Sequence, residues 1–358
     1  MSRFVFLTKT RWDEPPRIRH QLARLLSEAG HEVVFFEKPE PVWRSLPAPR
    51  ERGAHLRLAR HHELVHHKLR LIAPADHLNA WATTRSLRQA LRRAGVTPDA
   101  VVVNFNYDYW FLRRVFPTQR LITMINDDFT SSALFGYSGP LRHALARTCR
   151  ASDRVLTVSR PLQRDLAAFC QAELFLPWAD REYAAPASST RDLLLFWGYI
   201  NRRFDFPLVE SLARELATAR PQLRLLIVGP VEQGAGETLS RLQGLGNVDV
   251  RPASSLDDLP VERVLASLIP YRADSAENDA CELPNKALQL LARGLPLLIS
   301  GMPHFIDEPF VFRVGKMPIA AQVDELRSRF DDLQPAIQRL VATHSRAARL
   351  EQFMRLAA

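Results

Sequence analysis

The sequence lacks the long apolar run that a membrane-spanning helix needs. No stretch of 18 uncharged apolar residues occurs in its 358 residues, whereas about 20 are required to cross a bilayer. The opening MSRFVFLTKTRW has an apolar stretch too short for a secretory signal, and charged residues follow it in place of a cleavage site. We therefore expect a cytoplasmic protein, one that can also sit at the inner face of the cytoplasmic membrane.

Cysteine is almost absent. The chain contains only Cys149, Cys170 and Cys281, an odd number at wide spacing. Disulfide frameworks and cysteine-based zinc sites need paired or clustered cysteines. The sequence therefore excludes both and favours a reducing compartment.

No metal-binding pattern is complete either. His61, His62, His66 and His67 are spaced like a metal pair, but Glu63 is the one acid that could complete the ligand set. We expect this segment to form a solvated or membrane-facing basic surface. We expect no metal site and no cofactor.

The charge of the chain is unevenly distributed. Residues 1–180 contain 27 Lys and Arg against 17 Asp and Glu, whereas the remainder contains 21 against 22, for a net charge of +9. A basic half can meet an anionic membrane, an acidic substrate or nucleic acid, or simply use arginine as its surface residue. Because no segment interleaves aromatic and basic residues as nucleic-acid modules do, we expect no nucleic-acid partner.

Short apolar runs alternate with amphipathic segments in both halves, which is typical of parallel sheets with helical crossovers. The predicted strands of the first half are Phe4–Leu7, Val33–Phe36, Leu69–Ile72, Ala100–Val103, Leu121–Met124 and Val155–Val158. The predicted helices there are Arg17–Ala29, Thr84–Ala94, Leu141–Ala151 and Leu162–Phe169. Leu176–Arg191 is rich in proline and small residues, and we interpret it as a linker.

The same alternation restarts after the linker. The predicted elements are strands at Leu193–Trp197, Leu225–Val228, Val248–Val250, Leu265–Pro270 and Leu297–Ile299, and a helix at Phe206–Ala219. We expect an α/β protein with two Rossmann-like domains, at 1–180 and 181–340, and a cleft between them. Residues 341–358 are predicted to form a C-terminal helix that packs back on the first domain.

Residues 268–300 predict a ligand site. Pro284 suits the first turn of a helix, because its ring fixes φ and it has no amide hydrogen to leave unbonded. Gly294 ends this helix, and an apolar strand follows. The helix therefore starts at the carboxyl edge of a parallel sheet, where open α/β sheets bind ligands and free amides favour phosphate. Lys286 adds a positive charge to the first turn, so we expect an anionic ligand.

Six segments together resemble one known family. They are WDEPPRIRHQLARLLSEAGHEVVFFEKP, INDDF, ASDRVLTVS, LFWGYINRRFDFPLVESLA, LRLLIVGP and the stretch of residues 268–300. In order and spacing they resemble nucleotide-sugar glycosyltransferases of the two-domain GT-B fold, particularly bacterial enzymes that build surface polysaccharides. The resemblance covers most of the chain, from about residue 3 to residue 305.

The resemblance implies that the C-terminal domain binds a nucleotide-diphosphate sugar. Lys286 and Arg202 or Arg203 would contact the leaving diphosphate. The other implied donor-binding residues are Gly198, Gly229, Tyr271, Pro284, Asn285 and Gln289. Gln289 stands where the family has a ribose-binding glutamate, and Cys281 stands where a second acid often lies, with Glu282 one residue away.

The implied acceptor side lies in the N-terminal domain. Trp12, Glu14 and Arg17 belong to the loop after the first strand, where acceptor contacts are expected. Asp127 and Asp128 follow a strand, and one of them could act as a general base or orient an acceptor hydroxyl. A polar turn with a helix-capping role is the alternative for this pair.

Together these features predict a glycosyltransferase that moves a sugar from a nucleotide-diphosphate sugar to a hydroxyl of a glycan or lipid-linked acceptor. The resemblance implies hexosyl transfer in bacterial surface-polysaccharide synthesis, with retention of configuration and without a metal. The basic half would contact an anionic membrane. Two alternatives stay open: a catalytically inactive partner subunit on a GT-B scaffold, which Gln289 and Cys281 favour, and a sugar-nucleotide epimerase.

Overall fold

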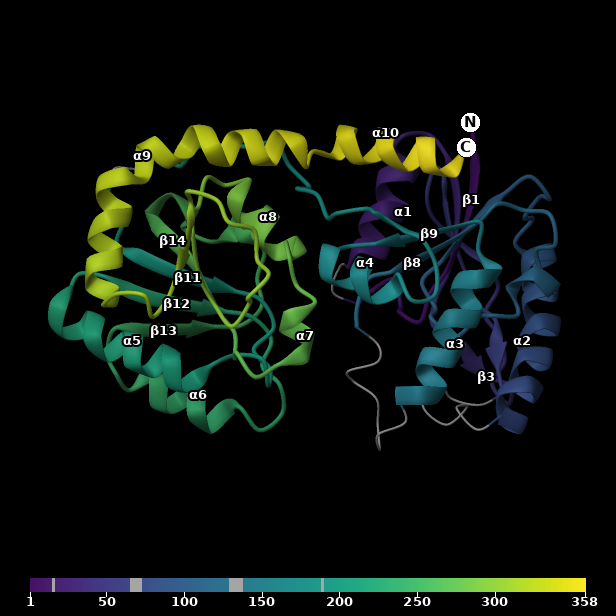
Figure 1. The fold of residues 1–358 in the computed structure, drawn as a ribbon, viewed down its shortest axis with the longest axis horizontal. Helices are drawn as coiled ribbons and strands as arrows, with labels where there is room; N and C mark the ends of the chain where they lie inside the picture. Colours follow the sequence, from purple (N-terminus) through teal and green to yellow (C-terminus); the bar gives the residue numbers. More distant parts are fainter. Residues whose placement is uncertain (15–16, 65–72, 129–137, 188–189) are drawn as a thin grey trace. The chain divides into compact units, whose positions relative to one another are not determined.

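The computed structural model describes residues 1–14, 17–64, 73–128, 138–187 and 190–358. Its contacts divide the chain into two compact units (Figure 1). Unit 1 comprises Met1–Leu176 and Ala347–Ala358, and unit 2 comprises Pro177–Arg346. The end of the chain therefore belongs to the same unit as its beginning.

The described part of unit 1 is built on a sheet with the strand order β10-β9-β8-β7-β1-β2-β5-β4. Neighbouring strands are parallel, except that β4 runs antiparallel to β5. The strands are β1 (Arg3–Leu7), β2 (Glu32–Phe36), β4 (Arg50–Gly53), β5 (Leu56–Ala59), β7 (Val101–Asn104), β8 (Leu121–Ile125), β9 (Arg154–Thr157) and β10 (Ala172–Leu174). A separate parallel pair consists of β3 (Glu40–Pro41) and β6 (His62–Glu63). The apolar run of β8 is buried throughout, as in a parallel sheet covered on both faces.

Helices accompany this sheet. They are α1 (Ile18–Glu28), α2 (Ala73–Arg93), α3 (Ser138–Ala151), α4 (Arg160–Leu166) and α10 (Arg346–Ala357), with a 3-10 turn, η1, at Leu112–Arg114. The chain turns out of α1 at Gly30, whose φ of 83° lies in the left-handed region that favours glycine. On α10, Phe353 packs against Phe4 and Phe175 with ring centroids 5.8 and 5.7 Å apart. The last helix therefore lies beside the first strand, and both chain ends are close together in Figure 1.

Unit 2 is built on a parallel sheet whose order is β13-β12-β11-β14-β15-β16 within the described residues. The strands are β11 (Leu193–Trp197), β12 (Arg224–Val228), β13 (Val248–Arg251), β14 (Val264–Pro270), β15 (Leu297–Ser300) and β16 (Val311–Arg313). The helices are α5 (Phe206–Ala219), α6 (Gly236–Gln243), α7 (Ala276–Asp279), α8 (Asn285–Leu291) and α9 (Ile319–Thr343), with 3-10 turns η3 (Leu256–Asp258) and η4 (Val261–Arg263). The helix α9 is bent in Figure 1 and contains Pro335, which lacks the amide hydrogen that a regular helix needs there.

Most strand predictions are confirmed. The strand predicted at Leu193–Trp197 is β11, and those predicted at Phe4–Leu7 and Leu121–Met124 match β1 and β8 to within one residue. The short strands β4, β5 and β10 were not predicted, because each contains charged residues that interrupt an apolar run. The strand predicted at residues 69–72 lies outside the described residues.

The prediction for α2 was incomplete. The helix predicted at Thr84–Ala94 is the second half of a longer helix that starts at Ala73. Its first half buries the polar residues Asn79 and Thr83. Because polar residues occupy its inward face, the apolar period that marks a helix is missing from that part of the sequence.

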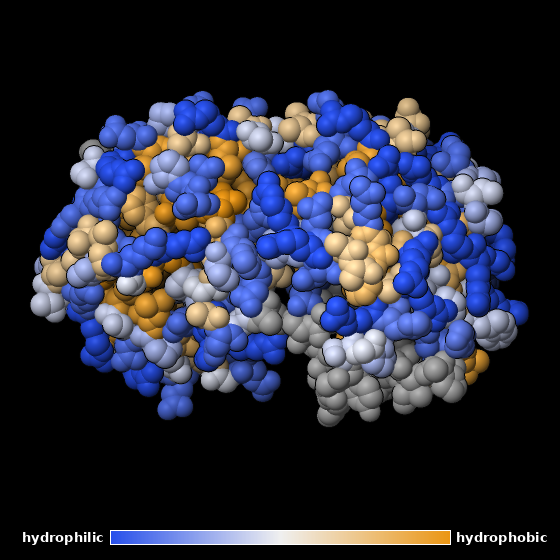
Figure 2. Space-filling view, viewed as in Figure 1, coloured by the Kyte–Doolittle hydropathy of each residue, from blue (hydrophilic) through white to orange (hydrophobic). Residues whose placement is uncertain are grey.

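The face of the molecule seen in Figure 2 is mainly polar. Hydrophilic residues predominate on the face seen in Figure 2, and apolar residues appear between them. Across the described helices, none combines the length and the apolar character that a membrane span requires.

Candidate functional site

Lys286 is the central residue of the site in unit 2. It lies in the first turn of α8, for which Pro284 is the N-cap residue. Its ammonium nitrogen Nζ is buried and has no hydrogen-bond partner among the described residues. It lies 4.3 Å from the ring centroid of Tyr271 and 4.7 Å from that of Phe196. Aromatic faces attract a cation but offer no hydrogen-bond acceptor in the ring plane, so the three ammonium hydrogens are suited to an anionic ligand.

Two glycines leave space around Lys286. Gly198 follows β11, has a φ of 149°, and a Cβ added to it would lie 3.4 Å from Lys286 Nζ. Gly229 follows β12, and a Cβ there would lie 1.8 Å from the carbonyl oxygen of Gly198. No side chain fits at Gly229, and a Cβ at Gly198 would touch the ammonium group and need a backbone conformation that favours glycine. The two strand ends therefore pack closely beneath Lys286 because both residues are glycine.

The structure distinguishes Arg203 from Arg202. The guanidinium of Arg203 lies 4.6 Å from the ring centroid of Tyr271, the same ring that Lys286 contacts. Its Nε donates a 2.7 Å hydrogen bond to Oδ1 of Asn278. Arg202 is exposed, and its backbone N–H donates to Glu232 Oε2 at 2.9 Å. Of the two arginines, Arg203 is thus placed with Lys286 around one aromatic ring.

Asn278 is a residue that the sequence analysis missed. It is fully buried, and its Nδ2 donates a 2.8 Å hydrogen bond to the carbonyl oxygen of Arg272 while its Oδ1 accepts from Arg203. It therefore orients the Arg203 side chain. Asparagine in a polar loop has no distinctive sequence pattern, so only its burial reveals this role.

Gln289 is engaged within its own unit. It is buried, and its Oε1 accepts from the backbone N–H of Asp180 at 3.3 Å. Its Nε2 donates to the carbonyl oxygen of Trp178 at 3.3 Å and to Asn285 Oδ1 at 3.4 Å. A ribose contact through Gln289 stays a prediction, and it would require exchange of these bonds. Glu282 is buried nearby in sequence, and Cys281 is half-buried.

In unit 1, the loop after β1 is held by buried side chains. Trp12 is only 5% exposed, and its ring lies 5.0 Å from Phe35 and 5.5 Å from His20 between centroids. Trp12 therefore packs inward and supports the loop, whereas Glu14 is half-buried and Arg17 is exposed. Acceptor contacts through Trp12, Glu14 and Arg17 stay predictions.

His20 fixes the start of α1. Its Nδ1 accepts from the backbone N–H of Arg17 at 3.1 Å, so its Nε2 is the protonated nitrogen and donates to the carbonyl oxygen of Arg11 at 3.0 Å. Burial is the main cause that lowers the pKa of His20 to about 4. The ring is therefore neutral near pH 7, and it works as a structural link across the loop.

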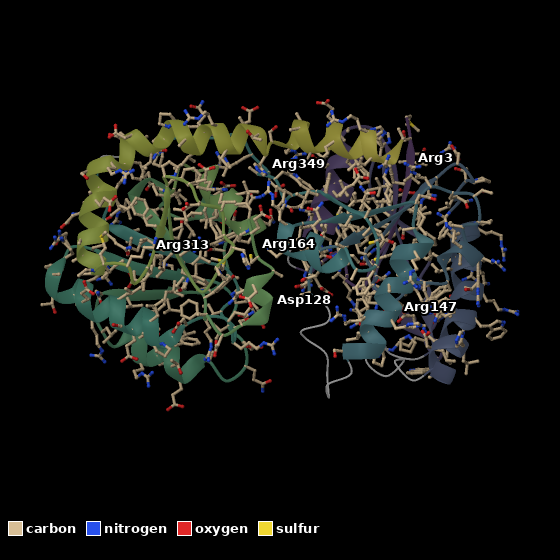
Figure 3. All side chains as sticks on the ribbon, in the orientation of Figure 1. Arg3, Asp128, Arg147, Arg164, Arg313 and Arg349 are labelled. Carbon is tan, nitrogen blue, oxygen red and sulfur yellow. The ribbon has the colours of Figure 1, made fainter. Side chains whose placement is uncertain are left out.

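Asp127 and Asp128 follow β8, at the carboxyl edge of the unit 1 sheet. Asp127 is exposed, Asp128 is half-buried, and the backbone N–H of Asp128 donates to Asp127 Oδ1 at 3.1 Å. Asp128 is labelled in Figure 3. This hydrogen bond is typical of a polar turn, and a role of either aspartate in catalysis stays a prediction.

The prediction for His61 was wrong. His61 is fully buried instead of solvated, and its Nε2 lies 2.9 Å from the hydroxyl of Tyr109, which donates to Glu63 Oε1 at 2.5 Å. Tertiary packing of β5 and β6 against the segment after β7 buries it, which the local sequence does not show. His66 and His67 lie outside the described residues. Within the described ranges, no group of three His, Cys, Asp or Glu side chains is arranged to bind a metal.

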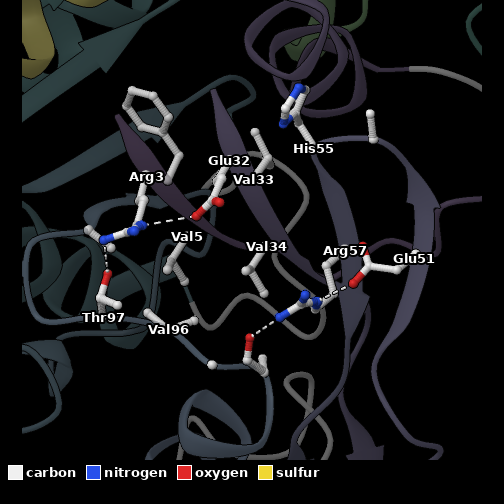
Figure 4. A pocket seen from close by; sticks show the side chains of 15 residues that line it. Arg3, Val5, Glu32, Val33, Val34, Glu51, His55, Arg57, Val96 and Thr97 are labelled. Atoms are coloured by element: carbon white, nitrogen blue, oxygen red, sulfur yellow. Dashed lines mark hydrogen bonds and ion pairs between the residues drawn. The ribbon is translucent and has the colours of Figure 1, made fainter. Parts of the chain in front are cut away.

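A small cavity lies at the opposite edge of the unit 1 sheet. Its volume is about 100 Å³, and Figure 4 shows it beside the amino-terminal ends of β1 and β2. Two ion pairs line it: Arg3 Nε to Glu32 Oε2 at 2.9 Å, and Arg57 Nε to Glu51 Oε1 at 2.6 Å. Ligand pockets usually have roughly 300–1,000 Å³, and the charges here neutralise each other. This cavity is therefore not the candidate site.

Comparison with known proteins supports the predicted GT-B fold. Residues 17–174 match the family model described as Glycosyltransferase Family 4. A search of curated proteins with the sequence finds no match.

Solved structures resemble the whole chain. Sucrose-phosphate synthase from Thermosynechococcus elongatus superposes with a TM-score of 0.71 at 14% identity, covering 99% of this chain and 98% of that one. Alpha,alpha-trehalose 6-phosphate synthase from Burkholderia multivorans has a TM-score of 0.64 at 12% identity, covering 100% and 98%. WaaG, a glycosyltransferase involved in lipopolysaccharide biosynthesis, has a TM-score of 0.60 at 16% identity, covering 99% of each chain.

These likenesses confirm the predicted fold class. The chain has the GT-B fold of two Rossmann-like domains, and residues 17–174, less than half of the chain, match the Glycosyltransferase Family 4 model.

Proposed function

We propose that this GT-B protein is a glycosyltransferase that moves a sugar from a nucleotide-diphosphate sugar to a hydroxyl group of an acceptor. The observation that carries the proposal is Lys286, whose buried ammonium group has no hydrogen-bond partner among the described residues. An unpaired buried cation is costly for the folded protein, and a diphosphate would supply the missing acceptors. The family match and the fold agree with this chemistry.

Lys286 and Arg203 would stabilise the leaving nucleoside diphosphate. Negative charge grows on the diphosphate as the bond to the sugar breaks, and fixed cations placed there lower the barrier. The ring of Tyr271 holds both cations in place. Gly198 and Gly229 keep the nearby strand ends free of side chains. In this proposal the reaction needs no metal or cofactor, because protein cations neutralise the diphosphate, and configuration is retained.

We propose a glycan or lipid-linked acceptor and a role in bacterial surface-polysaccharide synthesis. Support for this comes from the likeness to WaaG, a glycosyltransferase of lipopolysaccharide biosynthesis. The likeness to sucrose-phosphate and trehalose-phosphate synthases makes a small soluble acceptor the competing choice.

Contact with an anionic membrane is proposed for one surface of unit 1. Trp43 is 76% exposed and Trp81 is 60% exposed. The carbonyl oxygen of Arg44 accepts from His62 Nε2 at 2.7 Å, and the backbone N–H of His62 donates to Ser86 Oγ at 2.8 Å, so the loop with Trp43 is linked to α2.

The exposed face of α2 continues with arginines. They are Arg85, Arg88, Arg92 and Arg93. Tryptophans beside arginines are typical of proteins that dock on anionic lipid. The wild type should co-sediment with vesicles that contain phosphatidylglycerol. The double variant Trp43→Ser/Trp81→Ser should lose this co-sedimentation. Equal sedimentation of both proteins would contradict the proposal.

The second candidate is a binding subunit without activity. It is favoured by Gln289, whose amide is used in bonds to the backbone of its own unit. Such a protein would bind nucleotide without turnover.

The first test is a thermal-shift panel of UDP, GDP, dTDP, CMP and ADP and their sugar conjugates. A ligand that binds the native state raises the melting temperature. One nucleoside diphosphate should stabilise the wild type and the control Lys316→Ala, which changes an exposed lysine of the same unit, but not Lys286→Ala. No shift of the wild type with any nucleotide would refute the transferase. Binding without sugar transfer in an acceptor screen would support the binding subunit.

A further inference from the structure

The start of α1 contains a buried positive charge that the donor chemistry does not use. Arg19 is the second residue of α1 and is only 6% exposed. Among the described residues it makes no hydrogen bond or ion pair, and its Nε is buried without a partner. Its guanidinium carbon lies 5.7 Å from the ring centroid of Phe105, the residue that follows β7. Arg19 therefore sits at the carboxyl edge of the unit 1 sheet.

The other buried charges at this edge are paired. Asp108 accepts from Lys9 Nζ at 2.7 Å. Arg60 bonds Glu37 at 2.9 Å through Nε and Glu40 at 2.9 Å through Nη1. Folded proteins neutralise buried charges in this way because an unpaired one is strongly unfavourable. Arg19 differs from these residues, because it has no ion-pair partner among the described residues.

The surroundings of Arg19 leave it available to an anion. The first turn of α1 has no acidic residue, and its N-cap residue is the exposed Arg17. Burial, followed by repulsion from Arg17, lowers the pKa of Arg19 to about 10, while Asp127 and Glu14 attract it from a distance. The side chain therefore keeps its charge at neutral pH. The helix amides and this guanidinium together favour a negatively charged ligand.

Further buried polar atoms lie unpaired along the same edge. Both side-chain polar atoms of Asn106, Oδ1 of Asn126 and Oγ1 of Thr157 have no partner within the described residues. These residues follow β7 and β8 and end β9, and parallel strands bring their carboxyl ends to one edge. Amide and hydroxyl groups of this kind match sugar hydroxyls, which both donate and accept.

We propose that the acceptor of this enzyme carries an anionic group, a phosphate or a carboxylate, and that Arg19 binds it at the start of α1. This inference rests on the proposed transferase function and defines its acceptor as an anionic sugar. Asn106 and Asn126 bind hydroxyl groups of the same molecule. Recognition of the anion compensates for a buried charge that has no partner among the described residues.

The test measures ligand binding to the full chain by calorimetry, without nucleotide and in phosphate-free buffer. The probes are glucose 6-phosphate, glucuronate, inorganic phosphate and uncharged glucose. At least one anionic probe should bind the wild type, and its dissociation constant should rise about tenfold or more in Arg19→Met. The control Arg24→Met changes an exposed arginine of the same helix and should leave binding unchanged. Preference for the phosphates or for glucuronate identifies the anionic group.

Two readouts separate this binding from a structural contribution. Arg19→Met should have a higher melting temperature than the wild type without ligand, because it removes an unpaired buried charge. Arg19→Lys keeps the charge but loses the planar fork, so its anion affinity should be intermediate. A lower melting temperature of Arg19→Met, unchanged anion affinity in that variant, or no binding of any anionic probe to the wild type would overturn the proposal.

Failure of the transferase function gives a different pattern. Nucleotide binding depends on Lys286 in unit 2, and anion binding depends on Arg19 in unit 1. If nucleotides fail to bind while glucose 6-phosphate or glucuronate binds through Arg19, the transferase is refuted and the anion site is supported. If nucleotides bind and no anionic probe does, the anion site alone is refuted.

Discussion

Units 1 and 2 share a parallel-sheet architecture but treat buried positive charge differently. In unit 2 the ammonium of Lys286 rests against aromatic rings, and glycines keep the adjacent strand ends bare. In unit 1 the same kind of edge is crowded with charges, and Lys9 and Arg60 are each paired with acids. Within the described residues, only tertiary contacts show that Arg19 is left out of this pairing. In both units, the proposed ligand position rests on a buried cation that has no hydrogen-bond partner among the described residues.

The comparison also separates two ways of building a site. Unit 2 depends on the absence of side chains at two strand ends, so steric changes should damage it most. Unit 1 depends on buried polar groups, so changes of protonation and hydrogen bonding should damage it most. The predictions below test this contrast.

The largest effect is expected from Gly229→Ala. The new Cβ would lie 1.8 Å from the carbonyl oxygen of Gly198, and no rotation of a methyl group relieves such a contact. We expect a loss of roughly 3 kcal/mol or more in the free energy of unfolding, together with loss of nucleotide binding, measured by urea denaturation and calorimetry. Gly236→Ala is the control, because a Cβ there meets nothing within 4 Å. Equal stability of the two variants would contradict the steric account.

The second largest effect is expected from acidification, which should lower the stability of unit 1. The pKa of His20 is lowered from 6.5 to about 4 in the folded protein, mainly by burial. Between these values the unfolded chain binds a proton that the folded chain does not, so stability falls as pH drops from about 6.5 towards 4. The slope is about 1.4 kcal/mol per pH unit, a total of roughly 3 kcal/mol. Burial lowers the pKa of His31 as well, and it adds in the same direction.

Urea denaturation at a series of pH values measures this slope. His20→Gln should flatten it, because the titrating ring is gone, whereas His304→Gln, a change to an exposed histidine of unit 2, should not. If His20→Gln keeps the full slope, burial of this ring is not what makes the protein acid-sensitive.

A smaller effect is expected from Gln289→Glu, which introduces the acid that the family resemblance implies at this position. A carboxylate cannot donate to the carbonyl oxygen of Trp178 as Nε2 of Gln289 does. We expect a loss of about 1–3 kcal/mol in stability and no gain in nucleotide affinity, measured by denaturation and calorimetry. Gln233→Glu, which changes an exposed glutamine of the same unit, is the control and should leave stability unchanged. Tighter nucleotide binding by Gln289→Glu would place residue 289 at the ribose and count against its internal role.

Much of the fold was predictable from sequence because short apolar runs and glycine-ended helices mark parallel sheets locally. The same logic predicted that Gly198, Gly229 and Tyr271 lie at strand ends and Lys286 in the first turn of a helix, and the structure brings them together. The choice of Arg203 over Arg202 was not predictable. It depends on Asn278, which is distant in sequence and has no motif of its own.

The sequence by itself determined two α/β halves, most of their strands and helices, and the lysine in the first turn of α8. These properties follow from local periodicity and from glycine and proline, whose effects act within a few residues. The tertiary structure alone decided which charges are paired. Burial and pairing depend on neighbours from other strands, so Arg19, Asn278 and His61 acquire their properties only when the sheets are assembled.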